Sequence, residues 1–137
     1  MLPVEMIVIV RLLLAVVLGI LVGVEREISH KPAGLRTHAL VSLGACLFTV
    51  ISIYYFNMDP ARVAAGIVAG IGFIGGGSII ATKGQVQGIT TAASLWCVAA
   101  IGLAAGVGAY VLAVVSTVLV FGILWLKRAE NPMQEKE

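Results

Sequence analysis

The stretch that decides the fold is ITTAASLWCVAAIGLAAGVGAYVLAVVSTVLVFGILWL, residues 89–126. Its 38 residues include no Asp, Glu, Lys or Arg, and as one helix they would extend about 57 Å at roughly 1.5 Å per residue. The hydrocarbon core of a bilayer is roughly 30 Å thick and is crossed by about 20 residues. The run therefore predicts two membrane-spanning helices, at 89–102 or slightly beyond and at 109–126, joined by a turn.

The composition of the whole chain agrees with a membrane protein. Of its 137 residues, 60% are hydrophobic and only 12% are charged, whereas soluble domains carry about 25% charge. The length allows one domain, which we place at 1–126 as a transmembrane domain, followed by a polar cytoplasmic tail at 127–137. The net charge of +2 is too small and too dispersed to indicate nucleic acid as a partner.

Apolar runs at 4–24, 37–56 and 61–81 complete a set of five predicted spans, so we expect an all-α membrane protein with short connections. The basic residues then predict the orientation, because Lys and Arg concentrate in cytoplasmic loops. Seven of the nine fall on one side of the predicted membrane: Arg26, Lys31, Arg36, Lys83, Lys127, Arg128 and Lys136. This predicts an N-terminus outside and a C-terminus inside. A four-span alternative, with 89–126 crossing once, would break that asymmetry.

Glycine pairs four residues apart predict close helix packing, because backbones without side chains can approach each other. The pairs are Gly19 with Gly23, Gly66 with Gly70, Gly72 with Gly76 and Gly102 with Gly106. The predicted packing positions are Gly19, Gly23, Gly70, Gly72, Gly75 and Gly76. Three of them also spell GxGxxG, but the strand, helix and acidic residue that a dinucleotide site needs are absent from the predicted pattern. A locally broken helix around 75–77, whose exposed backbone could meet an ion, is the alternative to plain packing.

Arg11 lies inside the first predicted span, where a charge costs a few kcal/mol on insertion scales. Two interpretations stay open. The side chain could snorkel to the outer surface, or it could pair with Glu5 or Asp59, which the topology places on the same side. Asp59 and Pro60 are typical of an N-cap and a first helical residue, with Arg62 one turn further on.

On the inner side, charged residues from two spans converge. Glu25, Arg26 and Glu27 close the first span, while Arg36, Thr37 and His38 open the second. The convergence indicates either a solvated rim or a surface that docks a partner or an ion.

The fourth span carries small polar side chains, at Thr90, Thr91, Ser94 and Cys97. Thr90, Ser94 and Cys97 share one helix face, although Ser and Thr often bond back to their own helix. Both histidines lie near loops, and nothing in the sequence resembles a nucleophile with a positioned base, so we predict no enzyme and no cofactor. Cys46 and Cys97 show no disulfide or metal-ligand spacing, and any metal ligand remains unassigned.

Three segments together resemble the membrane domain of the MgtC/SapB family: GVEREISHKPAGLRTHALVSLGACLF, DPARVAAGIVAGIGFIGGGSII and VQGITTAASLWCVAAIGLAAGVGAY. The resemblance extends from Leu13 to Leu126. Matching positions include Glu25, Arg26, Arg36, Asp59, Arg62, the glycines at 70–77, Thr90, Thr91, Trp96 and Cys97. Many members continue into a cytoplasmic ACT-like domain, so we expect a short SapB-like form or a piece of a longer protein.

The resemblance implies a multi-pass protein of the bacterial inner membrane, linked to adaptation to low magnesium and, in pathogens, to virulence. Some members are proposed to restrain the F-type ATP synthase. We therefore expect a self-associating regulator that contacts other membrane proteins. A cation path would need acidic groups inside the membrane, whereas the few acidic groups of this chain lie near the ends of the spans. The alternative is a transporter or channel component for Mg2+ or another cation.

Overall fold

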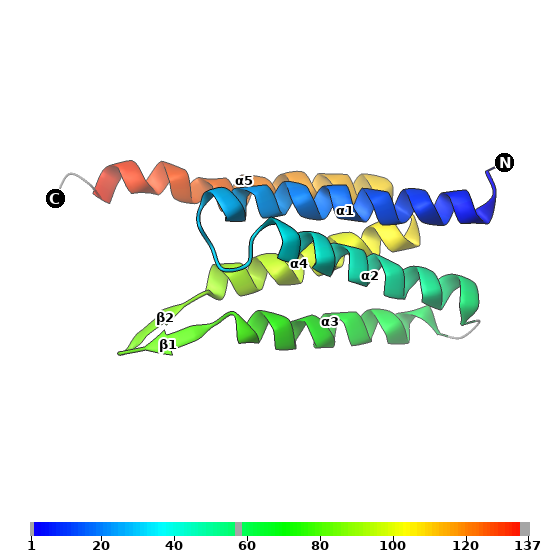
Figure 1. Ribbon diagram of the computed structural model, residues 1–137, viewed down its shortest axis with the longest axis horizontal. Coiled ribbons are helices and arrows are strands. Elements are labelled where there is room, and N and C mark those ends of the chain that lie inside the picture. The colour runs from blue at the N-terminus through cyan, green and yellow to red at the C-terminus, as the bar shows by residue number, and fades with distance from the viewer. Residues whose placement is uncertain (1, 57–58, 135–137) are drawn as a thin grey trace.

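The computed structural model describes residues 2–56 and 59–134, and its described part consists of five helices and one small hairpin (Figure 1). The elements are α1 (Val4–Ile28), α2 (Leu35–Tyr55), α3 (Pro60–Gly77), β1 (Ile80–Thr82), β2 (Gln85–Gln87), α4 (Ile89–Val107) and α5 (Tyr110–Gln134). The expectation of five helices is confirmed, and the hairpin is an addition to the expected all-α fold.

The uncharged run at 89–126 is divided at Gly108. This residue has φ 84°, a left-handed conformation that favours glycine, and it ends α4. Its N–H donates to the Ala105 carbonyl at 3.1 Å, and the Ala109 N–H donates to the Ala104 carbonyl at 2.9 Å. The chain reverses here, so α4 and α5 are separate helices, as the length of the run predicted.

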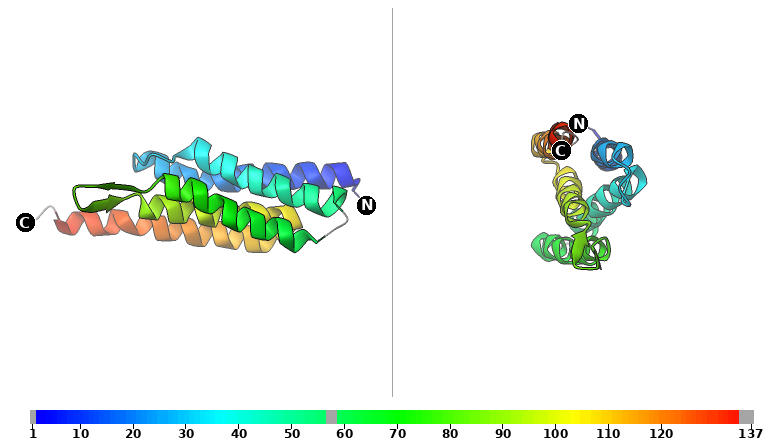
Figure 2. Two further views of the ribbon diagram at one scale, coloured as in Figure 1. Left: turned by 90° about the horizontal axis from the view of Figure 1, so that it is seen from below. Right: turned by 90° about the vertical axis from the view of Figure 1, so that its left-hand side faces the viewer.

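Four helices are long and apolar enough to cross a membrane, namely α1, α2, α3 and α4. The apolar part of α5 for which side chains are described, Tyr110–Leu126, is shorter. The backbone of α5 continues as a helix to Gln134. All five helices lie roughly along one axis, which suits a bundle that crosses a bilayer (Figure 2).

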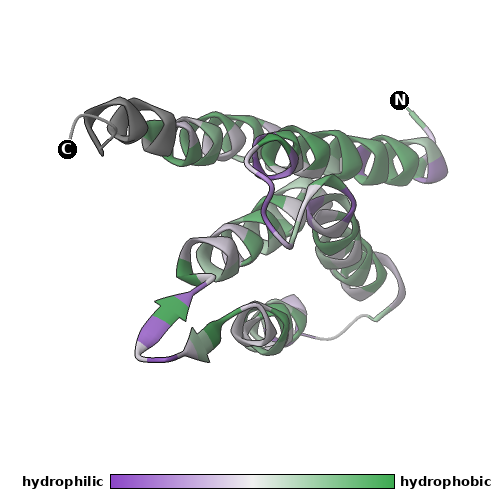
Figure 3. Cartoon of the chain, turned by 60° about the vertical axis from the view of Figure 1, so that its left-hand side comes forward, coloured by the Kyte–Doolittle hydropathy of each residue, from purple (hydrophilic) through white to green (hydrophobic). Residues whose placement is uncertain are grey.

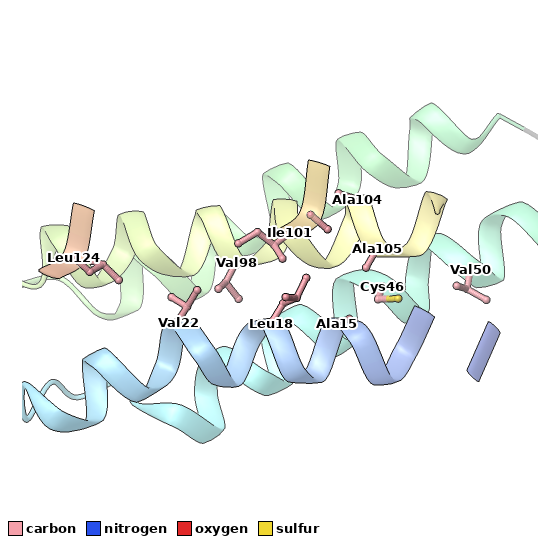
Figure 4. Close-up of a cluster of buried hydrophobic side chains, with 11 residues drawn as sticks. Ala15, Leu18, Val22, Cys46, Val50, Val98, Ile101, Ala104, Ala105 and Leu124 are labelled. Atoms are coloured by element: carbon pink, nitrogen blue, oxygen red, sulfur yellow. The ribbon is translucent and has the colours of Figure 1, made fainter. Parts of the chain in front are cut away.

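Helix α4 occupies the centre of the bundle and touches each of the other four helices. The view along the bundle shows α3 at its edge, on the far side of α4 from α5 (Figure 2). Leu18 and Val22 of α1 point towards Val98 and Ile101 of α4 (Figure 4), and all four are buried. The apolar core therefore lies mainly between α1, α2 and α4.

Helix α2 turns its polar side chains inwards. Ser42, Thr49 and Ser52 are buried, whereas Leu40 and Phe48 are exposed. The Thr49 hydroxyl donates to the Ala45 carbonyl at 2.7 Å, so its own helix satisfies it. Apolar residues cover most of the bundle's length and the hydrophilic ones gather towards its ends (Figure 3), a distribution that suits a surface in contact with lipid.

The hairpin was not predicted, because the sequence 82–88 indicated only a turn-rich connection and the third span was expected to reach residue 81. Helix α3 instead ends at Gly77, and Ala81 pairs with Val86 in an antiparallel ladder. Lys83 and Gly84 form the turn with φ values of 50° and 79°. Two successive positive φ values are typical of the tight turn that joins two twisted strands.

The glycine pairs fall into two groups. A Cβ at Gly19 would lie 2.7 Å from the His38 carbonyl oxygen, and one at Gly23 would lie 2.6 Å from Leu35 Cα, so α1 and α2 touch through their backbones. Gly75 meets Ala92 of α4 at ordinary contact distance. Nothing lies within 4 Å of a Cβ at Gly70, Gly72 or Gly76. The described chain therefore leaves those three positions of α3 uncovered.

Candidate functional site

A cluster of polar side chains is buried where α1 ends and where α2 and α4 begin. Burial of this kind is uncommon for charged groups unless they are paired, yet Glu25 is only 3% exposed, Arg26 2% and His38 0%. Three helices supply its buried members. We call the following residues the polar cluster: the buried Glu25, Arg26, His38, Ser42, Thr91 and Ser94, and the half-buried Ser29 that follows α1.

An ion pair forms the first part of the polar cluster. Arg26 Nη1 lies 3.3 Å from Glu25 Oε2, and the Ser29 hydroxyl donates to Glu25 Oε1 at 2.6 Å. Among the residues that the structure describes, Glu25 Oε2 and Arg26 Nε have no hydrogen-bond partner. The pair therefore neutralises its own charge inside the protein but keeps unused hydrogen-bonding capacity on both members.

A chain of hydrogen bonds through His38 forms the second part. His38 Nδ1 lies 2.9 Å from the Gly34 carbonyl oxygen, and Nε2 lies 2.9 Å from Ser94 Oγ. Ser94 Oγ is also 2.8 Å from the Thr91 carbonyl oxygen. Because a carbonyl only accepts, Nδ1 carries a hydrogen, and a neutral ring must accept at Nε2.

When His38 is neutral, its ring and the Ser94 hydroxyl supply two hydrogens, which is one too few for all three hydrogen bonds. The single hydrogen of the Ser94 hydroxyl can go either to His38 Nε2 or to the Thr91 carbonyl. A second proton on His38, at Nε2, would fill every contact. With a neutral ring, one of the three contacts therefore lacks a hydrogen, and the contact between His38 and Ser94 links α2 to α4.

Glu27 and Arg36, the remaining charged residues of the predicted inner rim, are exposed. Glu27 Oε2 accepts a hydrogen bond from the Leu35 N–H at 3.0 Å, so this carboxylate caps the start of α2. The rim is thus divided: Glu25 and Arg26 belong to the interior, while Glu27 and Arg36 stay at the surface.

Arg11 is held at the opposite end of the bundle by the connection between α4 and α5. Its Nη1 donates to the Gly106 carbonyl at 2.8 Å, and its Nε donates to the Tyr110 hydroxyl at 3.3 Å. The guanidinium carbon lies 5.7 Å from the centre of the Tyr54 ring, a cation–π distance. Neither Glu5 nor Asp59 pairs with Arg11 among the described residues.

The other predicted residues lie apart from these two sites. Asp59 Oδ1 accepts from the Ala61 N–H at 3.1 Å and Pro60 begins α3, so the predicted N-cap is confirmed. Arg62 is exposed on α3, and Cys97 is half-buried on α4. Thr90 is exposed but Thr91 is buried, so Thr91 and Ser94, not Thr90, face the interior.

Among the residues that the structure describes, no three His, Cys, Asp or Glu side chains come together in a way that could hold a metal ion. The role of His38 was missed because the sequence places it beside a loop. One signal could have revealed it. His38, Ser42, Ala45, Thr49 and Ser52 recur on one face of α2 at helical spacing, and this face is the buried one.

The model of the MgtC family matches residues 12–131, which include α2, α3 and α4 in full, most of α1 and α5, and the whole polar cluster. This chain belongs to the MgtC family. The match confirms the resemblance that the three sequence segments indicated. The family assignment covers both the buried ion pair and the His38 chain, so these features are part of an MgtC membrane domain.

Relatives in several bacteria support the assignment. The protein named "Protein MgtC" in Salmonella typhimurium is 45% identical over 112 residues, covering 82% of this chain and 48% of the relative. An Escherichia coli K12 protein named "Putative magnesium transporter YhiD" is 41% identical over 125 residues, covering 85% of this chain and 58% of the relative. An uncharacterized protein of Haemophilus influenzae is 40% identical over 129 residues, covering 86% of this chain and 54% of the relative.

This MgtC-family chain spans about half the length of the curated relatives that it matches. No solved structure matches it. The relatives' names connect two of them with MgtC or with magnesium, and none of the three names states an enzymatic activity.

Proposed function

We propose that this protein acts in the bacterial inner membrane during adaptation to scarce magnesium, as a regulator that binds other membrane proteins. The observation that carries the proposal is the uncovered face of α3. Only Ile71 and Gly75 of this helix are buried, although α3 is long and apolar enough to cross a membrane. Because the described part of the chain covers so little of α3, most of the surface of this helix is available to helices of other proteins.

The shape of that face suits a helical partner. Between α2 and α3 lies an apolar groove of about 580 Å3, whose walls include Phe48, Val63 and Ile74. Gly66 and Gly70 line the groove, and a Cβ at either would meet none of the described residues within 4 Å. Small residues on a spanning helix let a second backbone approach closely, and van der Waals packing then drives association.

The charged groups of the spanning helices support a regulator rather than a conductor. A conducting site for Mg2+ needs carboxylates or converging carbonyls near mid-membrane, because this ion prefers near-octahedral oxygen ligands. Glu25 is instead occupied by Arg26 and Ser29, and Arg11 by Gly106 and Tyr110. Arg11 thereby joins α1 to α4 and α5 at one end of the bundle, whereas the contacts of Glu25 lie within the end of α1 and the residue that follows it.

The arrangement of the loops supports an orientation with the N-terminus outside and the C-terminus inside. The loop between α1 and α2, the hairpin and the end of α5 lie at the same end of the bundle (Figure 1). Four basic residues lie in these segments or in the helix ends beside them: Arg26, Lys31, Arg36 and Lys83. Basic residues concentrate on the cytoplasmic side, so this end faces the cytoplasm in our proposal.

We further propose that the chain self-associates and that the F-type ATP synthase, which the family resemblance implies, is a target. Replacing Gly76 with Leu should weaken assembly in detergent or lipid, because the new side chain would separate backbones that touch between chains. We expect the same change to leave the chain's own fold intact, since a Cβ at Gly76 meets no described residue within 4 Å. Crosslinking followed by gel filtration measures the effect, and a Gly76→Leu variant that assembles like the parent would place the contact elsewhere.

The alternative, transport of Mg2+ or another cation, is favoured by the name of the Escherichia coli relative. The two functions give opposite results in liposomes. We expect purified protein to admit no more Mg2+ than empty liposomes, while deletion of its gene slows growth at low Mg2+. The parent and Gly122→Leu should restore growth, and Gly76→Leu should not. Saturable Mg2+ uptake by liposomes that contain only this protein would establish the alternative.

A further inference from the structure

His38 lies where a change of charge would act directly on helix packing. Its side chain has no exposed surface, although histidine is the side chain that gains a charge in mildly acidic solution. Nδ1 contacts the Gly34 carbonyl just before α2, and Nε2 contacts Ser94 in the second turn of α4. The ring therefore joins the start of α2 to the start of α4.

The ionisable groups near this ring come from four segments. They are Glu25, Arg26 and Glu27 of α1, His30 and Lys31 of the following loop, Arg36 of α2 and Cys97 of α4. Glu25 and Arg26 act on His38 with opposing fields, and they are paired with each other. Helix α4 has no charged residue, and the one charged residue of α3, Arg62, lies at the opposite end of the bundle (Figure 1). No carboxylate in this set is therefore free to balance a charge on His38 by itself.

Two effects compete when His38 takes up a proton. The added hydrogen on Nε2 would complete the hydrogen bonds through Ser94 to the Thr91 carbonyl. The same proton would place a positive charge at a position with no exposed surface. The net gain from one hydrogen bond is smaller than the cost of taking a charge out of water. The closed bundle therefore keeps the ring neutral, and a protonated ring needs contact with water.

A cavity gives water a route to the edge of the polar cluster. It measures about 840 Å3 and lies between the end of α1, the hairpin, the first turn of α4 and α5. Arg26 and Thr91 belong both to its lining and to the polar cluster. The Thr91 carbonyl oxygen is 2.8 Å from Ser94 Oγ, so one residue separates the cavity wall from the contact between Ser94 and His38.

We propose that His38 is a proton-operated switch, whose neutral ring holds the start of α2 against α4 and whose protonation at Nε2 releases this contact. Once this end of the bundle has opened, the ring meets water and titrates with the ordinary histidine pKa of about 6.5. The opened state then binds a proton that the closed state excludes. Falling pH therefore favours the opened state, and rising pH favours the closed one.

The switch connects to the groove between α2 and α3. Val41, about one turn after His38, lines this groove and packs against the buried cluster that contains Leu95, the residue after Ser94. A shift of the start of α2 therefore changes the shape of the groove. The effect on partners rests on the proposed function, whereas the switch itself does not, and its test uses the chain without a partner.

Hydrogen exchange of the full chain in lipid nanodiscs measures the opening. The exchange rates are corrected for the intrinsic effect of pH. Uptake of one proton predicts that the opening constant of the first turns of α2 and α4 rises about tenfold between pH 7.5 and 5.5. Amides near Val98 and Ile101, in the core of α4, should change much less. A parent protein whose first turns exchange equally at both pH values would overturn the proposal.

Variants of the two histidines assign the effect. His38→Gln, which is neutral at every pH, should abolish the tenfold change. His30→Asn is the matched control and should keep it, because His30 is the chain's other histidine and is exposed. Asn also tolerates the φ of 53° at this position. An equal change in His38→Gln and the parent would contradict the assignment to His38.

The His30→Asn protein also keeps the test decisive if His38→Gln does not fold. His38 is then the one imidazole in the nitrogen NMR spectrum of the chain. We expect a neutral ring with its hydrogen on Nδ1 at neutral pH, and a protonated signal that grows together with the exchange of the first turns of α2 and α4. A ring that becomes protonated while this exchange stays constant would show that the charge is accepted in the closed bundle, and the switch would be excluded.

Discussion

Replacing Gly102 with Leu should destabilise the protein by at least ~3 kcal/mol, the upper end of the range for overpacking a core. A Cβ at this position would overlap the Ser42 carbonyl oxygen. The obstacle is backbone of α2, which cannot rotate away as a side chain can. The central helix α4 would then separate from α2, on which it packs extensively. Unfolding in mixed micelles, followed by the fluorescence of Trp96 and Trp125, measures the loss.

Gly122→Leu is the matched control. This glycine also lies in an apolar helix, α5, but nothing in the described part of the chain lies within 4 Å of an added Cβ. Its variant should change stability by less than ~1 kcal/mol, with a small gain from helix propensity. Gly102→Ala should already be destabilised, because its Cβ alone meets Ser42. A Gly102→Ala variant as stable as the parent would show that α2 and α4 are not in backbone contact.

The helices could be predicted because hydropathy and length decide them with little help from tertiary contacts. Residues 89–126 had to turn, and the turn lies at Gly108, a glycine with positive φ. The hairpin could not be predicted in the same way. Its strands are three residues each, too short for a period-two pattern, and only Lys83 and Gly84 at the turn carried a weak signal.

The candidate site was only partly predictable. Glu25 and Arg26 were singled out by their charge, but the sequence could not decide between a solvated rim and a buried pair. That choice depends on how closely α1 approaches α2, which Gly19 and Gly23 allow. The contact of His38 with Ser94 joins residues 56 positions apart. No local spacing rule identifies such a partner, since it follows from the packing of α2 on α4.

The partners of Arg11, at the other end of the bundle, could not be predicted from the sequence either. Opposite charge drew attention to Glu5 and Asp59 as partners. The structure gives Arg11 the Gly106 carbonyl and the Tyr110 hydroxyl instead. A backbone carbonyl at a helix C-terminus carries partial negative charge and accepts well from a cation. Because every residue has a carbonyl, the sequence does not show which carbonyl will accept a hydrogen bond from Arg11.

The buried ion pair leads to the second large effect. Replacing Glu25 with Leu should destabilise the protein by about 3–5 kcal/mol, the usual cost of leaving one member of a buried pair without its partner. Arg26 would keep its charge at 2% exposure, and the Ser29 hydroxyl would lose its acceptor. Glu5→Leu is the control, because this exposed acid near the start of α1 contributes less than ~1 kcal/mol.

Removing both charges should cost less than removing one. In the double variant Glu25→Leu with Arg26→Met, no unpaired charge is buried, and apolar side chains of similar volume fill the space. The coupling free energy from the four proteins of the double-mutant cycle isolates the pair from its surroundings. If the double variant is as unstable as the sum of the single changes, the two side chains do not stabilise each other, and Arg26 must be held by a group other than Glu25.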